Sequence, residues 1–367
     1  MGMGKMVYFD NAATTKLLPE VSDFIKENLD TMWMNPSSAY RYEIKEQIEV
    51  TRSLIKSCIG ADEDDYIIFT SGGSEANSMI NGSVVIPTTT IEHDSMYAAD
   101  SECPFKVDGE GFVIIPDGYI SRKFISVQLA NNEIGTIQDL KAIREAFPNK
   151  LIHTDAVQAI GHIPVNVKEL GVDALSASAH KFGGPKGVGF LYVSKEAYDY
   201  IEPLIIGTQE NGMRGSTYNA IGIIAMGMAL KNSVQNMFDN TVQTVKVRNE
   251  ILEEMSKIPC AHLNGTNYFL KRLPGNLNYR FDGYRGEELQ MFLADHDIYV
   301  STGSACNTAS GKPSHVLKAI GLSDEEANSS IRISVDHNNT EHEALEFIGV
   351  LKEGIRVLHH EEGIYKG

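Results

Sequence analysis

The stretch Tyr66-Ile67-Ile68-Phe69-Thr70-Ser71-Gly72-Gly73-Ser74-Glu75 joins a short apolar run to a turn of serine and glycine. The β-branched and aromatic residues predict a buried strand, and the glycines predict a turn that leads into a helix. Such a turn presents backbone N–H groups, hydroxyls and the positive end of a helix, which together suit a phosphate group. Gly73 and Ser74 are therefore candidate anion-binding residues, although turns of this composition are more often purely structural.

The same alternation of strand and helix continues along the chain. Residues 17–29 and 44–59 have the apolar spacing of helices, and helical segments separate further predicted strands over residues 83–86, 124–127, 151–154 and 189–193. Strands that alternate with helices favour a mainly parallel sheet covered on both faces. The sequence therefore predicts an α/β fold, with ligand-binding residues at the carboxyl ends of the strands.

A second, smaller unit is predicted in the C-terminal part of the chain. Residues 277–281 and 330–334 have the pattern of strands, and residues 341–359 have the spacing of an amphipathic helix. At 367 residues the chain exceeds the size at which one hydrophobic core keeps growing, which favours two domains. We assign residues 16–250 to a large domain, and residues 1–15 and 251–367 to a smaller α+β domain.

Composition narrows the class of protein. The chain carries 32 basic and 49 acidic residues, a formal net charge of −17, which disfavours binding to nucleic acids and to anionic membranes. The longest apolar stretch, residues 220–230, is too short to span a bilayer, and the first residues lack the apolar core of a secretory signal. Four scattered cysteines without a C-x-x-C pair indicate reduced thiols, a cytoplasmic location and no metal centre.

One lysine has neighbours that a surface lysine rarely has. Lys181 follows Ser178-Ala179-His180 and precedes a glycine-rich turn, so its surroundings are small or apolar. An amine in such a setting can condense with an aldehyde cofactor, and Ser178 and His180 can both reach a phosphate. Upstream, Asp155 and Gln158 follow a predicted strand. An acid there can pair with a pyridine nitrogen, so the set predicts pyridoxal phosphate as cofactor.

Three further residues suit the same site. His93 can stack on an aromatic ring and move protons, and Asn132 offers a side-chain amide. Arg332, in an otherwise apolar predicted strand, suits a bidentate clamp on a carboxylate. Each has an ordinary structural alternative, namely a hydrogen-bonded histidine, a buried amide or a salt bridge.

Cys306 differs from the other cysteines, which are expected to be small core residues. It lies between residues 301 and 311 in a run of Ser, Thr, Gly, Ala and Asn, and such small or polar neighbours give a thiol few apolar contacts. We expect a mobile loop, from which a thiolate can attack a sulfur atom held at the cofactor and then swing outward. An aldehyde cofactor combined with such a thiol suggests the removal of sulfur from cysteine.

Taken together, these motifs carry a resemblance over nearly the whole chain. The sequence resembles the NifS/IscS-type cysteine desulfurases of the class V aminotransferase group, pyridoxal-phosphate enzymes of fold type I. The matching residues are 8–15, 35–38, 70–77, 92–93, 131–138, 153–158, 178–189, 209–210, 273–276, 301–306 and 314–317. The resemblance implies a mainly parallel seven-stranded sheet, L-cysteine as substrate, and alanine and an enzyme-bound persulfide as products.

The resemblance also implies a role for each candidate residue. Lys181 would carry the cofactor, His93 would stack on it and Cys306 would hold the persulfide. The cofactor would contact Gly73, Ser74, Asn132, Asp155, Gln158, Ser178, His180 and, from the neighbouring subunit of a homodimer, Thr217. The substrate would bind Asn11, Asn132 and Arg332. The sulfur would pass to a protein acceptor, such as an iron–sulfur scaffold or a tRNA-thiolation protein.

The chain also departs from the family pattern. The differing positions are Lys16, Tyr40, Glu43, Ser74 (where Thr is frequent) and the run Gly215-Ser216-Thr217. The chain is also shorter between residues 77 and 93 and between residues 108 and 124. Two alternatives remain open. One is a selenocysteine lyase or another β-eliminating class V enzyme, which would tolerate the loss of Cys306. The other is a catalytically silent scaffold in a sulfur-transfer assembly, which would have no need for the full set of cofactor and thiol residues.

Overall fold

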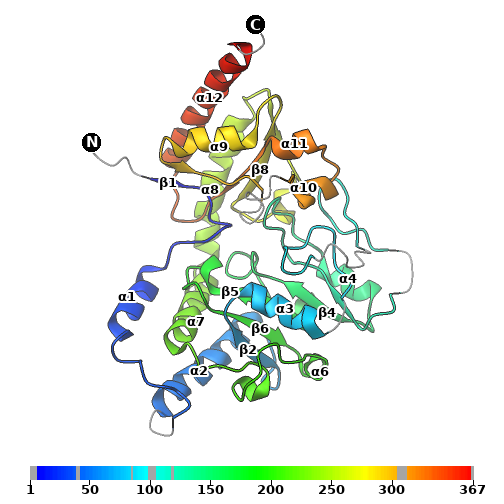
Figure 1. The fold of residues 1–367 in the computed structure, drawn as a ribbon, viewed down its shortest axis with the longest axis vertical. Coiled ribbons are helices and arrows are strands. Elements are labelled where there is room, and N and C mark those ends of the chain that lie inside the picture. Colours follow the sequence, from blue (N-terminus) through cyan, green and yellow to red (C-terminus); the bar gives the residue numbers. More distant parts are fainter. Residues whose placement is uncertain are drawn as a thin grey trace.

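The computed structural model describes residues 6–38, 42–83, 86–97, 105–116, 120–303 and 312–364 (Figure 1). The strands are β1 (Val7–Tyr8), β2 (Tyr66–Thr70), β3 (Phe124–Ser126), β4 (Leu151–Asp155), β5 (Ala174–Ser178), β6 (Gly189–Val193), β7 (Ala261–Leu263), β8 (Asn276–Phe281), β9 (Ile298–Tyr299) and β10 (Ser330–Ser334). The α-helices are α1 (Pro19–Asn28), α2 (Tyr42–Ile59), α3 (Gly73–Ser83), α4 (Leu140–Ala146), α5 (Val167–Leu170), α6 (Lys195–Tyr198), α7 (Ala220–Gln235), α8 (Met237–Met255), α9 (Gly286–Ala294), α10 (His315–Ala319), α11 (Asp324–Asn328) and α12 (Glu341–Ile364). Short 3₁₀ turns are η1 (Ala179–Lys181), η2 (Glu210–Gly212) and η3 (Phe269–Lys271).

The central sheet has the strand order β2-β6-β5-β4-β3. β6 pairs antiparallel with β2 and β5, whereas β3, β4 and β5 pair in parallel, so all strands of this sheet except β6 run in the same direction. A mainly parallel sheet is therefore confirmed. β5 was not among the strands predicted from the sequence, because its Ala-Leu-Ser-Ala-Ser run lacks the β-branched and aromatic residues that mark a strand.

The described residues contain five strands of this sheet, where the resemblance implied seven. The strand expected over residues 83–86 is wrong at its start, because α3 continues to Ser83; residues 84 and 85 lie outside the described residues. Next to β3, the carbonyl of Pro87 accepts from the N–H of Ser126 at 2.9 Å, and Thr89 forms an isolated bridge with Phe105. Proline has no N–H group to donate, so a regular ladder does not extend beyond β3 here.

Helices cover both faces of the sheet, as expected (Figure 1). Ile67 and Phe69 of β2 belong to a buried cluster that includes residues of α1, α2 and α7. Ile68, between them, packs instead with Ala76, Met79 and Ile80 of α3. The two-residue period of a strand explains this division, since successive side chains point to opposite faces.

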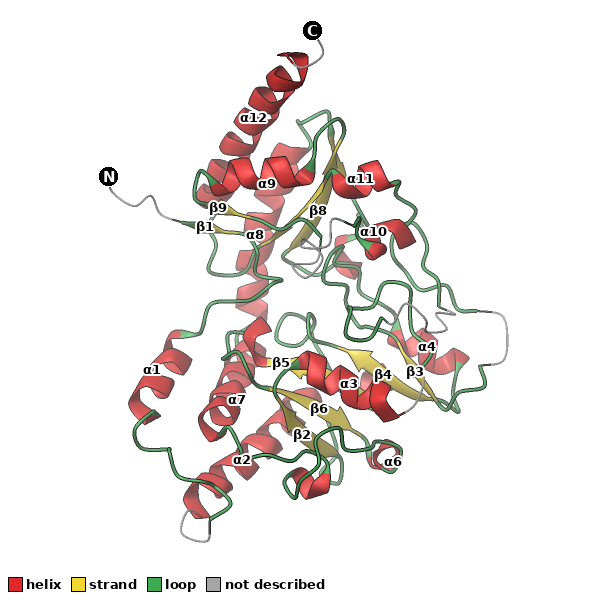
Figure 2. Ribbon diagram, in the orientation of Figure 1, coloured by secondary structure: helices red, strands yellow, loops and turns green. Residues whose placement is uncertain are grey.

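A second unit contains the three-stranded antiparallel sheet β10-β8-β7 and the parallel pair β1-β9 (Figure 2). Its buried cluster joins Val7 and Phe9 near the start of the chain to residues of α8, α9 and α12. The rings of Phe9 and Phe347 meet edge to face with centroids 5.6 Å apart. The first strand of the chain is therefore part of the unit formed by the C-terminal third.

The division of the chain into residues 16–250, and residues 1–15 with 251–367, stays a prediction. α8 runs without interruption from Met237 to Met255, across the boundary placed near residue 250 (Figure 2). Among the helices of the described ranges, none has the length and apolar character needed to cross a membrane.

Candidate active site

A cavity lies where β2, β4 and β5 end. The turn after β2, the end of β4 and the 3₁₀ turn after β5 form its walls, and the second unit contributes Arg332. This is the location expected for a ligand in an α/β sheet. The sequence-predicted residues that line it are Gly73, Ser74, His93, Asn132, Asp155, Gln158, Ser178, His180, Lys181 and Arg332.

Three predicted residues are not among those lining this cavity. Asn11 lines a neighbouring cavity, and Thr217 lines an adjoining hollow that shares Ser71 and Gly187 with the first cavity. Cys306 lies outside the described residues. The roles expected for these three residues stay predictions.

The turn between β2 and α3 packs closely against the segment that follows β4. A side chain at Gly73 would place its Cβ 2.5 Å from Cγ2 of Val157, so only glycine fits. Glu75 accepts from the N–H of Ser71 at 2.7 Å and pairs with Arg214 through contacts of 2.8 and 3.2 Å. Burial acts to raise the pKa of Glu75, but these hydrogen bonds hold it below its ordinary value. Glu75 is thus ionised, and Arg214 offsets its charge beside a turn that suits an anion.

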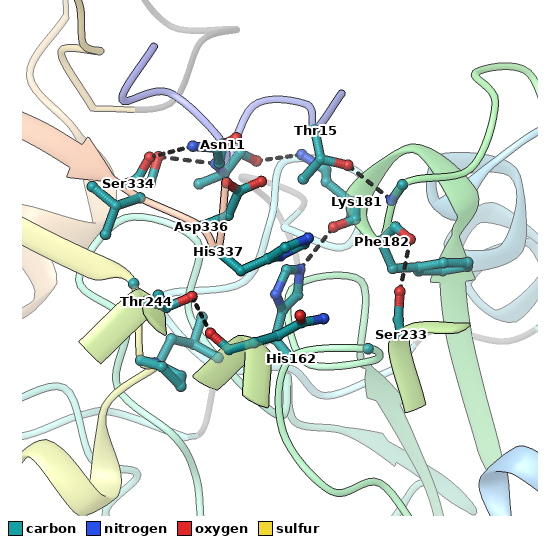
Figure 3. Close-up of a pocket in the computed structure, with 18 of the residues that line it drawn as sticks. Asn11, Thr15, His162, Lys181, Phe182, Ser233, Thr244, Ser334, Asp336 and His337 are labelled. Carbon is teal, nitrogen blue, oxygen red and sulfur yellow. Dashed lines mark hydrogen bonds between the residues drawn. The ribbon is translucent and has the colours of Figure 1, made fainter. Parts of the chain in front are cut away.

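Lys181 ends the 3₁₀ turn that follows β5. Its Nζ donates to the carbonyl oxygens of residues 12–13, at 2.5 and 2.9 Å. The carbonyl of Lys181 itself accepts from Nε2 of His162 at 2.7 Å, and that of Phe182 accepts from Oγ of Ser233 at 2.9 Å (Figure 3). Both the amine and the backbone of the lysine are therefore held by the surrounding chain.

A second cavity, drawn in Figure 3, lies next to the first. The two share Ala12, Gln158 and Lys181. Asn11 lines this cavity, and its Nδ2 donates to the carbonyl of Ser334 at 2.9 Å. In this structure the side-chain amide of Asn11 therefore ties the N-terminal segment to β10.

Asp155 lies at the end of β4 and is buried. Its carboxylate accepts from the N–H of Val157 at 2.9 Å and from Nδ2 of Asn77 at 2.7 Å. Gln158, three residues further on, donates from Nε2 to the carbonyl of Ala12 at 2.9 Å. The acid and the amide thus come from one short segment, and both are fixed by hydrogen bonds.

His180 precedes the lysine, and its Nδ1 lies 3.2 Å from Oγ1 of Thr14. Burial, together with the charges of Lys181 and Lys186, lowers the pKa of His180 to about 4. The ring is therefore neutral at pH 7, and it can contribute a hydrogen bond rather than a positive charge to a bound phosphate.

Arg332 is 2% exposed and lies in β10. Its Nη2 pairs with Oδ1 of Asp10 at 2.7 Å, and its Nη1 donates to the carbonyl of Asn132 at 3.2 Å. Its Nε is buried and has no hydrogen-bond partner within the described ranges. A buried N–H group without an acceptor is costly, so this arginine retains a donor that a substrate carboxylate can satisfy.

Sequence reasoning missed the residues that support the site, among them Asn77, Glu75, Arg214 and His162. Asn77 lies three residues after Ser74 on α3, a spacing that places two side chains on the same side of a helix. Asn77 also ends the family motif over residues 70–77, but the motif assigned it no role. Glu75 and Arg214 are 139 residues apart, and His162 and Lys181 are 19 residues apart, so no local spacing reveals these pairs.

Comparisons with known proteins agree with this geometry. Residues 7–102 and 120–347 match the family model described as Aminotransferase class-V. Two curated relatives are cysteine desulfurases IscS. The one from Clostridium botulinum (strain Hall) is 40% identical over 96% of this chain and 95% of the relative. The one from Dictyoglomus turgidum is 41% identical over 97% of this chain and 96% of the relative.

Among solved structures, a NifS-like protein from Rickettsia africae ESF-5 has a TM-score of 0.88 and 32% identity, covering 96% of this chain and 100% of that one. This likeness confirms the α/β fold expected of fold-type I pyridoxal-phosphate enzymes. Because the family model matches most of its length and both relatives match nearly all of it, the chain belongs to the aminotransferase class-V family.

Proposed function

We propose that this protein is a pyridoxal-phosphate-dependent cysteine desulfurase, which converts L-cysteine to L-alanine and holds the sulfur as a persulfide on Cys306. The observation that carries the proposal is the single cavity lined by Lys181, Asp155 and Arg332. The identity of about 40% to two cysteine desulfurases supports the same reaction for this chain.

The residues of the cavity fit pyridoxal phosphate. The turn over residues 71–74 offers backbone N–H groups for the phosphate, with Ser178 and His180 beside it. Asp155 is the acid for the pyridine nitrogen, and Lys181 is the amine for the aldehyde. When bound, the cofactor withdraws electrons from the substrate and so weakens the bonds at its Cα.

The chain's own side chains supply binding and proton transfer. Asn132 and Arg332 hold the substrate carboxylate, and the buried Nε of Arg332 is the donor that this contact would satisfy. Lys181 moves a proton at the substrate Cα, because its amine lines the cavity and is held there by the carbonyls of residues 12–13. His93, which lines the same cavity, assists that proton transfer.

Cys306 accepts the sulfur. Its thiolate attacks the substrate sulfur, so that an S–S bond forms and the Cβ–S bond breaks. The electron pair of the broken bond stays with the carbon, which takes up a proton and becomes the methyl group of alanine. The products are then alanine and a persulfide on Cys306, and a reductant or an acceptor thiol releases the sulfur.

A homodimer and a protein acceptor complete the proposal. Thr217 lines a hollow that shares Ser71 and Gly187 with the cavity of its own chain, and its role at the phosphate of a second subunit rests on the family resemblance. The preceding segment exposes Leu204 and Ile206, the latter by 92%, and a second copy of the chain would cover this apolar surface. The sulfur passes to an acceptor such as an iron–sulfur scaffold or a tRNA-thiolation protein in the cytoplasm.

The test measures alanine and sulfide released from L-cysteine in the presence of a reductant. We expect equimolar products from the wild type and no products from Cys306→Ala. Cys58→Ala is the matched control, because burial raises the pKa of this half-buried thiol and keeps it unreactive. It should turn over cysteine like the wild type.

Two other outcomes of this experiment would each support one of the alternative functions, a β-lyase or a silent scaffold. Products from Cys306→Ala at the wild-type rate would replace the persulfide mechanism with that of a β-lyase, such as a selenocysteine lyase. A wild-type protein that stays colourless after addition of pyridoxal phosphate and forms no product would instead be a silent scaffold.

A further inference from the structure

Asn77 lies in the wall of the cavity and is 1% exposed. Its Nδ2 donates both of its hydrogens, to Oδ2 of Asp155 at 2.7 Å and to Oγ of Ser95 at 2.9 Å. Its Oδ1 is buried and has no hydrogen-bond partner in the part of the chain that the structure describes. The amide therefore donates hydrogen bonds to two neighbours, while its own oxygen accepts none from the described residues. This arrangement favours a role beyond local packing.

The orientation of this amide follows from Asp155. An ionised carboxylate can only accept hydrogen bonds, so the nitrogen of Asn77 must face it, because the reverse orientation would bring two oxygens together. With both hydrogens of the nitrogen assigned, Oγ of Ser95 is an acceptor in its contact with Asn77. The hydroxyl hydrogen of Ser95 is then available to Nδ1 of His93, which lies 2.8 Å from Oγ.

The backbone of Ser95 leads to the same result by a separate contact. Its N–H group points at Nδ1 of His93 over 3.1 Å. A backbone N–H can only donate, so Nδ1 carries no hydrogen in this arrangement. A neutral imidazole then has its proton on Nε2, the nitrogen that Ser95 does not hold.

We infer that Asn77 is a positioning residue that holds the carboxylate of Asp155 and, through Ser95, fixes the proton of His93 on Nε2. Two groups that line the cavity are thereby linked by one side chain. The consequence for turnover rests on the proposed function, whereas the hydrogen-bond chain itself does not.

The test is nitrogen NMR of protein labelled with ¹⁵N-histidine, recorded with and without pyridoxal phosphate. The His93 signals are assigned by their loss in His93→Asn, since the chain has 11 histidines. We expect an unprotonated Nδ1 and a protonated Nε2 in the wild type. In Asn77→Ala and in Ser95→Ala the backbone N–H of Ser95 is the donor that remains at Nδ1, so we expect a measurable fraction of the Nδ1-protonated tautomer beside the wild-type form. Ser95→Thr, which keeps a hydroxyl, should restore the wild-type signals.

Asn81 provides a matched control on the same helix. It lies one turn after Asn77, and its Nδ2 donates to the backbone carbonyl of Ser95 at 3.2 Å. Asn81→Ala therefore disturbs the same segment without touching Asp155 or the Ser95 hydroxyl, and it should leave the tautomer of His93 unchanged. The inference is overturned if wild-type His93 carries its proton on Nδ1, or if Asn81→Ala shifts the tautomer as much as Asn77→Ala.

Cofactor binding and turnover give a second readout. Asn77→Ala removes a hydrogen bond to a charged group, so we expect affinity for pyridoxal phosphate to fall about 10- to 100-fold. At saturating cofactor, kcat should fall while KM for L-cysteine changes by less than about threefold, since Asn77 holds the acid rather than the substrate. A wild type that binds the cofactor but does not turn over cysteine would reject the proposed function and leave the NMR result to decide this inference.

Discussion

At the scale of single residues, the backbone of Lys181 depends on one imidazole. Nε2 of His162 donates to its carbonyl, and burial lowers the pKa of His162, so the ring is neutral at pH 7. We expect His162→Leu to leave a carbonyl without its donor and to lower the free energy of unfolding by about 1–3 kcal/mol. Because the amine moves with its backbone, kcat should fall about tenfold or more. His162→Gln keeps an N–H donor and should recover most of both quantities, as measured by urea unfolding and steady-state kinetics.

A variant at Ser233 is the control that distinguishes an effect on stability from an effect on the position of Lys181. Its hydroxyl donates to the carbonyl of Phe182, one residue beyond the lysine. Ser233→Ala should therefore cost a similar amount of stability and leave kcat close to the wild-type value. If His162→Leu unfolds more easily but turns over cysteine at the normal rate, the contact between His162 and Lys181 has no part in placing the amine.

The same scale shows which site residues a sequence can reveal. That Lys181 and Asp155 line one cavity was predictable, because their immediate neighbours, small residues in one case and a strand end in the other, are unusual for a charged side chain. Asn77 was not, since its partner Asp155 is 78 residues away and the contact exists only once α3 packs on the sheet. The candidate residues leave a local pattern in the sequence, whereas the residues that hydrogen-bond to them leave almost none.

At the scale of elements, three parallel strands share a buried polar contact. His153 of β4 is fully buried, with Nδ1 2.8 Å from Oγ of Ser126 on β3 and Nε2 2.9 Å from Oγ of Ser176 on β5. Burial lowers the pKa of His153 to about 3, against about 6.5 in an unfolded chain. Between these values the unfolded state binds a proton that the folded state does not, so the contribution of His153 to stability is lost as the pH falls below 6.5.

We expect His153→Leu to reduce stability at pH 7 by about 1–3 kcal/mol, because two serine hydroxyls lose their partner. The same variant should flatten the pH dependence, removing roughly 3 kcal/mol of the loss in stability between pH 6.5 and pH 4. Urea unfolding across that range measures both effects. The half-buried His262, which pairs with Asp282, is the control, and His262→Gln should keep the wild-type slope. A His153→Leu protein with an equally steep slope would show that other groups cause the acid sensitivity.

Helices and strands were predictable where the residue types and their spacing are typical of the element that forms. β2, β6 and β10 are rich in β-branched or aromatic residues, and α2 has helical apolar spacing, so their existence followed from the sequence. β5 has neither signal, and it becomes a strand because pairing with β4 and β6 satisfies its backbone. The irregular backbone at Pro87 could not be foreseen either, since it depends on which segment lies beside β3.

At the scale of the whole molecule, residues 10–15 connect the second unit to the lysine. Asp10 pairs with Arg332 of β10, and the carbonyls of residues 12–13 accept from Lys181. Thr15 donates to the carbonyl of His180 from both its N–H group and its hydroxyl, at 2.9 and 3.0 Å. Six residues near the start of the chain therefore touch both sides of the cavity, and Arg332 and Lys181 are placed relative to each other through them.

Asp10→Asn tests this arrangement, because it keeps the shape of the side chain and removes its charge. Arg332 would remain buried without its counter-charge, so we expect the free energy of unfolding to fall by about 3 kcal/mol. A carboxylate ligand would then supply the missing charge, and saturating L-alanine should raise the unfolding temperature of the variant more than that of the wild type. Thermal unfolding with and without alanine measures the difference.

Lys352→Gln is the control, because it removes an ion pair between α12 and α8 at the surface. It should change neither the free energy of unfolding nor the stabilisation by alanine. Equal stabilisation of Asp10→Asn and the wild type by alanine would mean that Arg332 does not meet the carboxylate.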